Sequence, residues 1–98
     1  MALTVALRYA DAEVLARYSE RGFELAALMP AFSDTDYPLL RLVDPYGDTY
    51  FSSYQMAGVI PELDRLVLND AAGLLAKVRE LALRCRETSH AFLVFIGD

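Results

Sequence analysis

Residues 38–53 read PLLRLVDPYGDTYFSS and carry the strongest local signal in this chain. Two short apolar runs flank the segment DPYGD at residues 44–48. Proline presets the backbone angle at the second position of a type I turn. The preceding aspartate can accept hydrogen bonds from the turn's amides, and the glycine can take a left-handed conformation. The stretch therefore predicts a β-hairpin over residues 39–53.

The pattern before this hairpin predicts one strand and one short helix. Residues 3–8 alternate apolar side chains with others, which is typical of a strand with one buried face. Asp11 as an N-cap and Gly22 as a stop predict a helix over residues 12–21, although the run VLARY within it also fits a strand. For residues 23–29 we expect a strand or irregular structure.

Two amphipathic helices are predicted after the hairpin. Pro61 is harmless only in the first turn of a helix, so the first helix should begin near residue 57 and span residues 57–68. The second, over residues 71–87, repeats the same helical spacing of apolar residues, and Asn69 or Asp70 can cap it. Matched apolar stripes and a short link predict an antiparallel pair on one face of a sheet.

The last apolar run, AFLVFI at residues 91–96, does not alternate. A strand of this kind is buried on both faces, so we expect it to lie inside the sheet. Together the elements predict a single compact α+β domain over residues 1–98. Its sheet should be small and mixed, with a central C-terminal strand and the two late helices on one face.

The composition is typical of a folded cytoplasmic protein. Hydrophobic residues make up 55% of the chain, which is enough to fill a core and too much for an intrinsically disordered chain. The start MALTVALRYA lacks the basic lead of a secretory signal, and no apolar run approaches the roughly 20 residues that cross a bilayer. A single cysteine, Cys85, excludes an internal disulfide and suits a reducing compartment.

The net charge of −5 is concentrated in the middle of the chain, where residues 31–64 hold six acids against Arg41 alone. Such a surface repels phosphates, so we expect no nucleic-acid partner. A basic protein or a cation would be attracted to it. The same acids are also what solvated turns commonly carry, and both interpretations stay open at this point.

Tyrosines are interleaved with these acids. Tyrosine offers a large, stiff contact area with a polar tip, and acids beside it speed the encounter with a basic partner. The alternative is that Tyr50 and Tyr54 belong to the core. The residues predicted to bind a protein partner are Asp34, Asp36, Tyr37, Asp44, Tyr46, Asp48 and Tyr54.

No other group of residues in the sequence indicates a catalytic or metal-binding site. His90 is the only histidine, and as a general base it would need an acid that the fold brings to it. Cys85 falls on the apolar stripe of the last helix, where a thiol packs as an inert side chain. Asp34 and Asp36 lack the glycine and glutamate of a calcium loop, and no phosphate-binding, zinc or nucleophile motif occurs. We therefore predict no cofactor and no metal, and favour a binding protein over an enzyme.

Two segments resemble a set of short uncharacterised bacterial proteins. The first segment has P-L-L at residues 38–40, V-D-P-Y-G-D-T at 43–49, Phe51, and Q-M at 55–56. The second segment has His90 and then L-V-F-I-G-D at residues 93–98. The resemblance implies a recurring domain and assigns it no activity. In size and acidity the chain is also similar to bacterial immunity proteins, which neutralise toxins.

These observations lead us to expect a non-enzymatic, immunity- or antitoxin-like module. It would present the acidic, tyrosine-rich hairpin end to a basic protein partner, of which a toxin is one example. The alternative is a homodimer that uses a sheet edge or an exposed helix, and a third hypothesis is a small enzyme or ligand sensor centred on His90. We expect no membrane partner.

Overall fold

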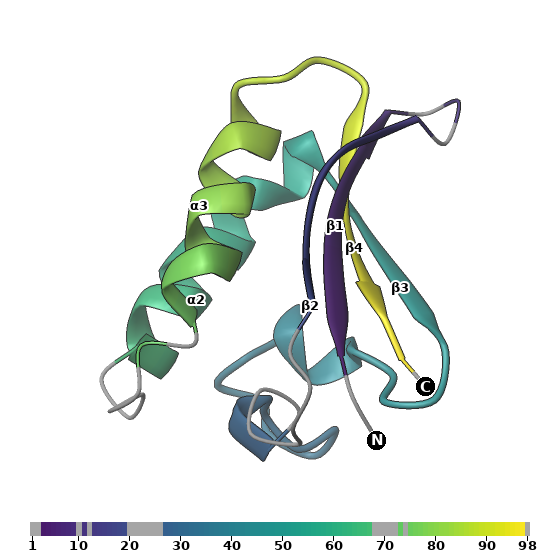
Figure 1. Cartoon of the computed structure of the whole chain (residues 1–98). Coiled ribbons are helices and arrows are strands. Elements are labelled where there is room, and N and C mark those ends of the chain that lie inside the picture. Colours follow the sequence, from purple (N-terminus) through teal and green to yellow (C-terminus); the bar gives the residue numbers. More distant parts are fainter. Residues whose placement is uncertain are drawn as a thin grey trace.

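The computed structural model describes residues 3–9, 11, 13–19, 27–67, 73 and 75–97. It has one four-stranded antiparallel sheet with two helices packed against one of its faces (Figure 1), which confirms the α+β class. The strands are β1 (Thr4–Tyr9), β2 (Val14–Ser19), β3 (Asp48–Ser52) and β4 (Ala91–Ile96). The helices are α2 (Met56–Val67) and α3 (Leu75–Arg86), with short 3₁₀ helices η1 (Leu40–Leu42) and η2 (Ser53–Gln55).

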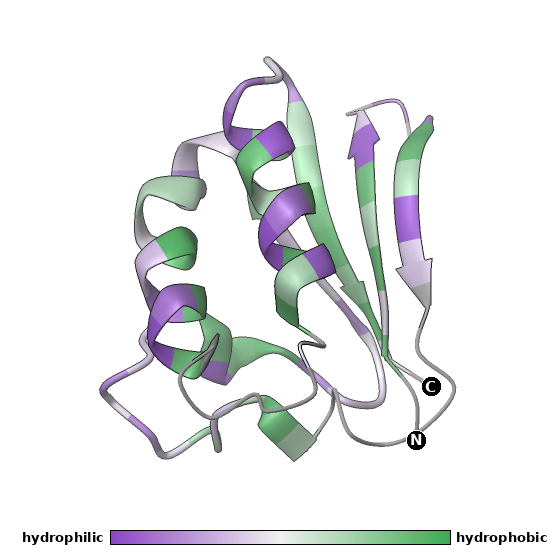
Figure 2. Ribbon diagram, turned by 60° about the vertical axis from the view of Figure 1, so that its left-hand side comes forward, coloured by the Kyte–Doolittle hydropathy of each residue, from purple (hydrophilic) through white to green (hydrophobic). Residues whose placement is uncertain are grey.

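β4 lies inside the sheet, as its uninterrupted apolar run predicted. The strand order is β2-β1-β4-β3, and Phe95 pairs with Val5 on one side and with Thr49 on the other. In Figure 2 this strand is coloured apolar along its length. The expectation of a mixed sheet is wrong, since every pairing is antiparallel. Two antiparallel helices separate β3 from β4 and return the chain to the end where β3 finished, so β4 must run in the opposite direction.

The two helices bury the stripes that the sequence predicted. α3 lies against β1, β2 and β4, and α2 packs beside α3 (Figure 1). The buried side chains are Met56, Val59, Ile60, Leu63 and Leu66 on α2, and Leu75, Val78, Leu81, Ala82 and Cys85 on α3. They form one continuous core with Leu3, which precedes β1, and with Val5, Leu7, Phe51, Leu93 and Phe95 from the sheet.

The start of α2 agrees with the prediction to within one residue, whereas α3 begins later than predicted. α2 begins at Met56, one residue before the predicted start, after a capping box between Ser52 and Gln55. The argument for that start is wrong, however, because Pro61 lies inside the helix and not in its first turn. α3 begins at Leu75 and not at 71, because Gly73 has a φ of 73°, a left-handed conformation that a right-handed helix does not contain. The caps predicted at residues 69 and 70 lie outside the described residues.

The early helix predicted over residues 12–21 is wrong, since the chain there forms the edge strand β2. The side chain of Asp11 accepts a backbone amide hydrogen, as a helix N-cap would, but it does so in the turn between β1 and β2. Its Oδ1 accepts a hydrogen bond from the Glu13 amide at 3.0 Å, and the Tyr9 amide donates to the Glu13 carbonyl at 2.9 Å. The β-branched and aromatic residues of VLARY then favour the extended chain. Of residues 23–29, only 27–29 are described. Residues 27 and 28 are helical and residue 29 lies in a bend, so the expected strand or irregular structure is wrong for residues 27 and 28.

The hairpin predicted over residues 39–53 is right in the aspartate contact of its turn and wrong in its first arm. The left-handed conformation expected of Gly47 is also wrong, since the φ of this glycine is not positive. Asp44 Oδ1 accepts a hydrogen bond from the Tyr46 amide at 2.9 Å, as the turn chemistry predicted. The preceding residues form η1, however, and β3 pairs with β4. The cause is a contact distant in sequence: the buried carboxylate of Glu62 on α2 accepts the amide hydrogens of Leu39 and Leu40 and holds this segment in a helical turn.

Candidate functional site

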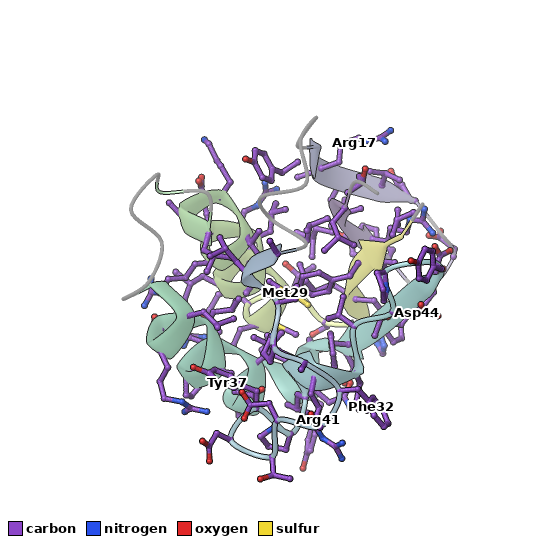
Figure 3. The ribbon with its side chains drawn as sticks, turned by 90° about the horizontal axis from the view of Figure 1, so that it is seen from below. Arg17, Met29, Phe32, Tyr37, Arg41 and Asp44 are labelled. Carbon is purple, nitrogen blue, oxygen red and sulfur yellow. The ribbon has the colours of Figure 1, made fainter. Side chains whose placement is uncertain are left out.

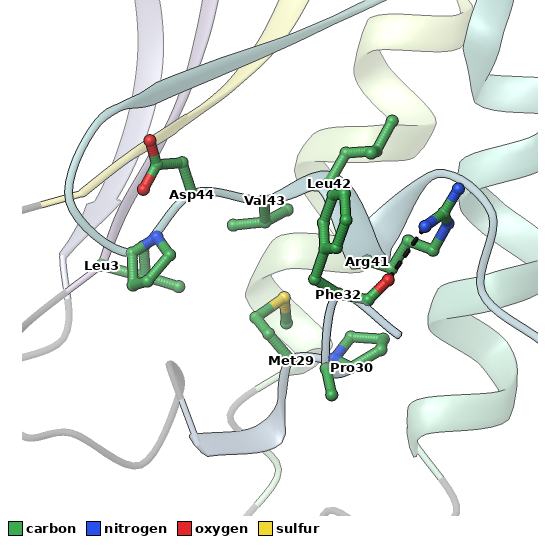
Figure 4. A pocket seen from close by; sticks show the side chains of 10 residues that line it. Leu3, Met29, Pro30, Phe32, Arg41, Leu42, Val43 and Asp44 are labelled. Atoms are coloured by element: carbon green, nitrogen blue, oxygen red, sulfur yellow. Dashed lines mark hydrogen bonds between the residues drawn. The ribbon is translucent and has the colours of Figure 1, made fainter. Parts of the chain in front are cut away.

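A cleft is lined by segments of the chain that lie at the lower end of the ribbon in Figure 1. It has a volume of about 520 Å³ and lies between residues 29–32 and residues 41–45, with Leu3 contributing to its lining (Figure 4). Most of its side chains are apolar, and the charged ones are Arg41 and Asp44. Apolar clefts of about 300–1,000 Å³ with a few polar groups are the usual form of binding sites in proteins.

Phe32 and Arg41 form one wall of this cleft. The Phe32 side chain is 71% exposed, which is unusual for a large apolar ring. The Arg41 guanidinium lies 5.1 Å from the ring centroid, and its Nη1 donates to the Phe32 carbonyl oxygen at 2.9 Å (Figure 4). The arginine therefore fixes the loop and stacks on the ring while the ring stays accessible to a partner.

Helix α2 fixes the position of the segment that carries this wall. Glu62 is 3% exposed, and its Oε1 accepts from the amides of Leu39 and Leu40 at 3.2 and 2.9 Å. One turn further along α2, the Arg65 guanidinium donates to the carbonyl oxygen of Asp36 and lies 4.9 Å from the Tyr37 ring centroid. One acid and one base of the same helix thus hold residues 36–40.

The opposite wall includes the turn at residues 44–47. The carboxylate of Asp44 accepts the amide hydrogen of Tyr46 and so closes the turn. The end of β4 supports the turn from behind, because a Cβ atom on Gly97 would lie only 2.5 Å from the backbone of Pro45. Glycine at position 97 is therefore what allows β4 to approach this wall so closely.

All four of the predicted aspartates lie at this end of the molecule, and none of them is in an ion pair within the described part of the chain. They are Asp34, Asp36, Asp44 and Asp48. The other two acids of residues 31–64 do not belong to this surface: Glu62 is buried, and Asp64 pairs with Arg79 on α3. We call the four aspartates, Tyr46 and the cleft the acidic end; Figure 3 views this end of the molecule from below.

The structure separates the predicted tyrosines. Tyr46 is 75% exposed at the tip of the turn and belongs to the acidic end. Tyr37 is half-buried beneath Arg65, so only part of its ring is accessible. Tyr54 is 93% exposed but lies in η2, past the far end of β3 from the turn (Figure 1). The structure therefore does not bring Tyr54 together with the other predicted residues.

Sequence reasoning missed the residues that give the cleft its shape. Met29, Phe32 and Leu42 line it, yet the first two precede the predicted hairpin and the third was placed in its first strand. The signal that could have found them was Phe32 itself, an aromatic residue in a loop without apolar periodicity. Nothing in the linear sequence shows that residues 29–32 fold against residues 41–45.

The other residues with chemical potential do not form a site. His90 is exposed with a φ of 61°, lines neither this cleft nor the smaller one between β2 and α3, and has no described carboxylate bound to it. Cys85 is buried, and this burial raises the pKa of its thiol to about 11, which keeps it protonated at neutral pH. Within the described residues no cluster of metal-binding side chains occurs.

Neither a protein-family model, nor a curated protein, nor a solved structure matches this chain. The candidate site accordingly rests on its own geometry. Of the helices in the described ranges, none combines the length and the apolar character needed to cross a membrane.

Proposed function

We propose that this protein is a non-enzymatic protein-binding module and that the acidic end is the surface that binds a basic partner. The observation that carries the proposal is the position of the cleft, an apolar cavity whose lining includes Asp44 and which lies at the same end of the molecule as Asp34, Asp36 and Asp48. None of these four aspartates has a described ion-pair partner. Interfaces of high affinity typically combine an apolar anchor in a pocket with complementary charge around it.

The charges at this end favour a partner rich in lysine or arginine. Asp36, Asp44 and Asp48 are exposed, so their carboxylates can meet cationic side chains without a large desolvation cost. Arg41 and Arg65 lie nearby, but their described hydrogen bonds run to backbone oxygens of this chain and their guanidinium groups stack on rings. A basic partner fits the immunity- or antitoxin-like role, in which an acidic protein covers a cationic toxin.

The cleft supplies the apolar part of such an interface. An aromatic or aliphatic side chain of the partner would enter between Phe32 and the turn at residues 44–47, against Leu42 and Val43. The rings of Phe32 and Tyr46 offer stiff, exposed contact area on either side. The partner's cations would then face Asp44 and the neighbouring aspartates.

The experiment compares two aspartates that have the same local role at opposite ends of the molecule. Asp44 and Asp11 each accept an amide hydrogen two residues further along the chain, so asparagine can keep that hydrogen bond in both. Immobilised wild-type protein, the double variant Asp44→Asn/Asp48→Asn and the control Asp11→Asn are exposed to extract from the source cell. Retained proteins are identified, and their affinities are measured by calorimetry.

We expect a basic protein to bind the wild type and Asp11→Asn equally, and the double variant at least about tenfold more weakly, since each lost charge contact contributes about 1 kcal/mol. Phe32→Ser should weaken the same binding without lowering the melting temperature, because the ring is exposed. A partner that binds all variants equally would contradict the proposal.

A homodimer is the second candidate function, and the strand order is the observation that favours it. β2 and β3 are the outer strands of the sheet, and a second copy could pair with either edge. Light scattering over a range of protein concentrations distinguishes the two functions. A dimer that persists in the double variant at the acidic end would show that the edge, and not this end, mediates association.

A further inference from the structure

The face of the sheet opposite the helices is covered by its own side chains. Ala6 and Val94 are buried although they lie outside the core cluster beneath the helices. By strand register, Arg8 and Phe92 form one cross-strand pair on this face, and Tyr50 pairs with Val94. The rings of Tyr50 and Phe92 meet edge to face, with centroids 6.2 Å apart. We call this surface the open sheet face.

Arg8 lies across this face without a described acidic partner. Its Nη1 donates to the Tyr50 hydroxyl at 3.1 Å, and its Nε is buried with no hydrogen-bond partner among the described residues. Arg17 adds a second cation, since it pairs with Ala6 and so points to the same side. Among the described strand residues of this face the acid is Asp48, and it lies at the opposite end of β3 from the level of Arg8. The middle of the open sheet face is therefore apolar and cationic.

We propose that the open sheet face binds an acidic, extended segment of a partner protein. A carboxylate that displaces the Tyr50 hydroxyl would receive two parallel N–H donors from the Arg8 guanidinium, which is the arrangement in which arginine binds carboxylates most strongly. An apolar side chain of the same segment would pack against Tyr50, which is 51% exposed, and Phe92. The open sheet face would bind acidic ligands, whereas the acidic end would bind basic ones. Binding at the open sheet face does not depend on binding at the acidic end.

An acidic peptide fits this surface better than a nucleic acid. Stacking aromatic rings and arginines on a sheet can serve either ligand. However, nucleic-acid binding rests on many phosphate contacts. In the described strands the arginines on this face are Arg8 and Arg17, and the net charge of the chain is −5. One or two carboxylates match that number of cations.

The test uses a capped, fluorescein-labelled octapeptide of alternating glutamate and phenylalanine. Its affinity for the protein is measured by fluorescence anisotropy, and its position by the amide chemical shifts of ¹⁵N-labelled protein. We expect shifts in β1, β3 and β4 around Arg8 and Tyr50, and binding that weakens as salt is added. Arg8→Met keeps the aliphatic cover over Val94 and removes the guanidinium, so it should weaken binding about tenfold or more.

Two further variants and two further ligands decide the outcome. Arg86→Met on α3 removes the same charge elsewhere and should leave the affinity unchanged. Arg8→Lys keeps the charge without the paired donors and should weaken binding partly, which also carries the test if Arg8→Met fails to fold. No binding at millimolar peptide, shifts confined to residues 29–48, or equal effects of Arg8→Met and Arg86→Met would each overturn the proposal. So would tighter binding of a lysine–phenylalanine octapeptide or of a twelve-nucleotide oligothymidine.

Discussion

Glu62 is a buried acid whose carboxylate accepts hydrogen bonds from the backbone amides of Leu39 and Leu40. Glu62→Ala would leave both amides buried without partners, so we expect the free energy of unfolding to fall by about 2–4 kcal/mol. Glu62→Gln should cost less, because its amide oxygen can still accept. Urea unfolding followed by circular dichroism measures both, and the exposed Glu80→Ala is the control. A loss in Glu62→Ala no larger than in the control would contradict the anchoring role.

The thiol of Cys85 gives a pH dependence whose sign can be worked out. Burial is the main cause that raises its pKa from 9.0 to about 11, against a smaller opposing effect of a backbone hydrogen bond from Leu93. A raised pKa in the folded state means that the folded protein holds the proton more tightly than the unfolded chain. The stability this provides is complete below pH 9 and is lost as the pH rises from about 9 to 11.

We therefore expect the wild type to lose about 2–3 kcal/mol of unfolding free energy more than Cys85→Ala does over that range. Other groups that titrate in this range do so in both proteins, so the difference between the two curves isolates the thiol. Parallel curves would show that Cys85 does not ionise differently in the folded protein.

At the scale of elements, the junction between β4 and the turn at residues 44–47 sets the second wall of the cleft. A methyl group at Gly97 would meet backbone atoms of Asp44 and Pro45 at 2.5–2.6 Å, and backbone cannot rotate away as a side chain can. We expect Gly97→Ala to lower the free energy of unfolding by about 1–3 kcal/mol and to weaken partner binding, because the turn must shift.

Gly58→Ala is the matched control for that substitution. Its new methyl group would contact only the end of the flexible Leu39 side chain, at 2.7 Å, and alanine favours a helix over glycine. It should therefore change stability little or improve it. Equal losses in the two variants would show that the Gly97 junction carries no special constraint.

The elements that could be predicted from the sequence are those whose pattern is local. The continuous apolar run of β4 and the stripes of α2 and α3 specify burial by themselves, and both predictions were confirmed. The prediction of a strand in the first arm of the hairpin was wrong because Glu62, more than twenty residues away in sequence, accepts hydrogen bonds from the amides of that segment. The helix predicted over residues 12–21 was wrong because an aspartate in a turn and an aspartate at an N-cap make similar contacts. Pairing with β1 is what makes residues 14–19 a strand.

At the scale of the whole molecule, the charge pattern could be predicted in part. The acids that cluster in the middle of the sequence do lie at one end of the fold, with two exceptions: Glu62 is buried, and Asp64 is paired with Arg79. The cleft could not be predicted, since it is made by two loops whose approach depends on contacts with α2 and β4. Tyr54 was grouped with the other tyrosines by proximity in sequence, but β3 separates it from them in space.

Tyr46 and Tyr54 allow the most direct measurement of where the partner binds. Both side chains are largely exposed, and they lie at opposite ends of β3. A photoreactive benzoylphenylalanine is placed at one or the other position in the source cell, and adducts are collected after irradiation. We expect the residue at position 46 to cross-link a basic protein and the one at position 54 to give no such adduct. Cross-linking of that protein from position 54 alone, or equally from both positions, would contradict the assignment of binding to the acidic end.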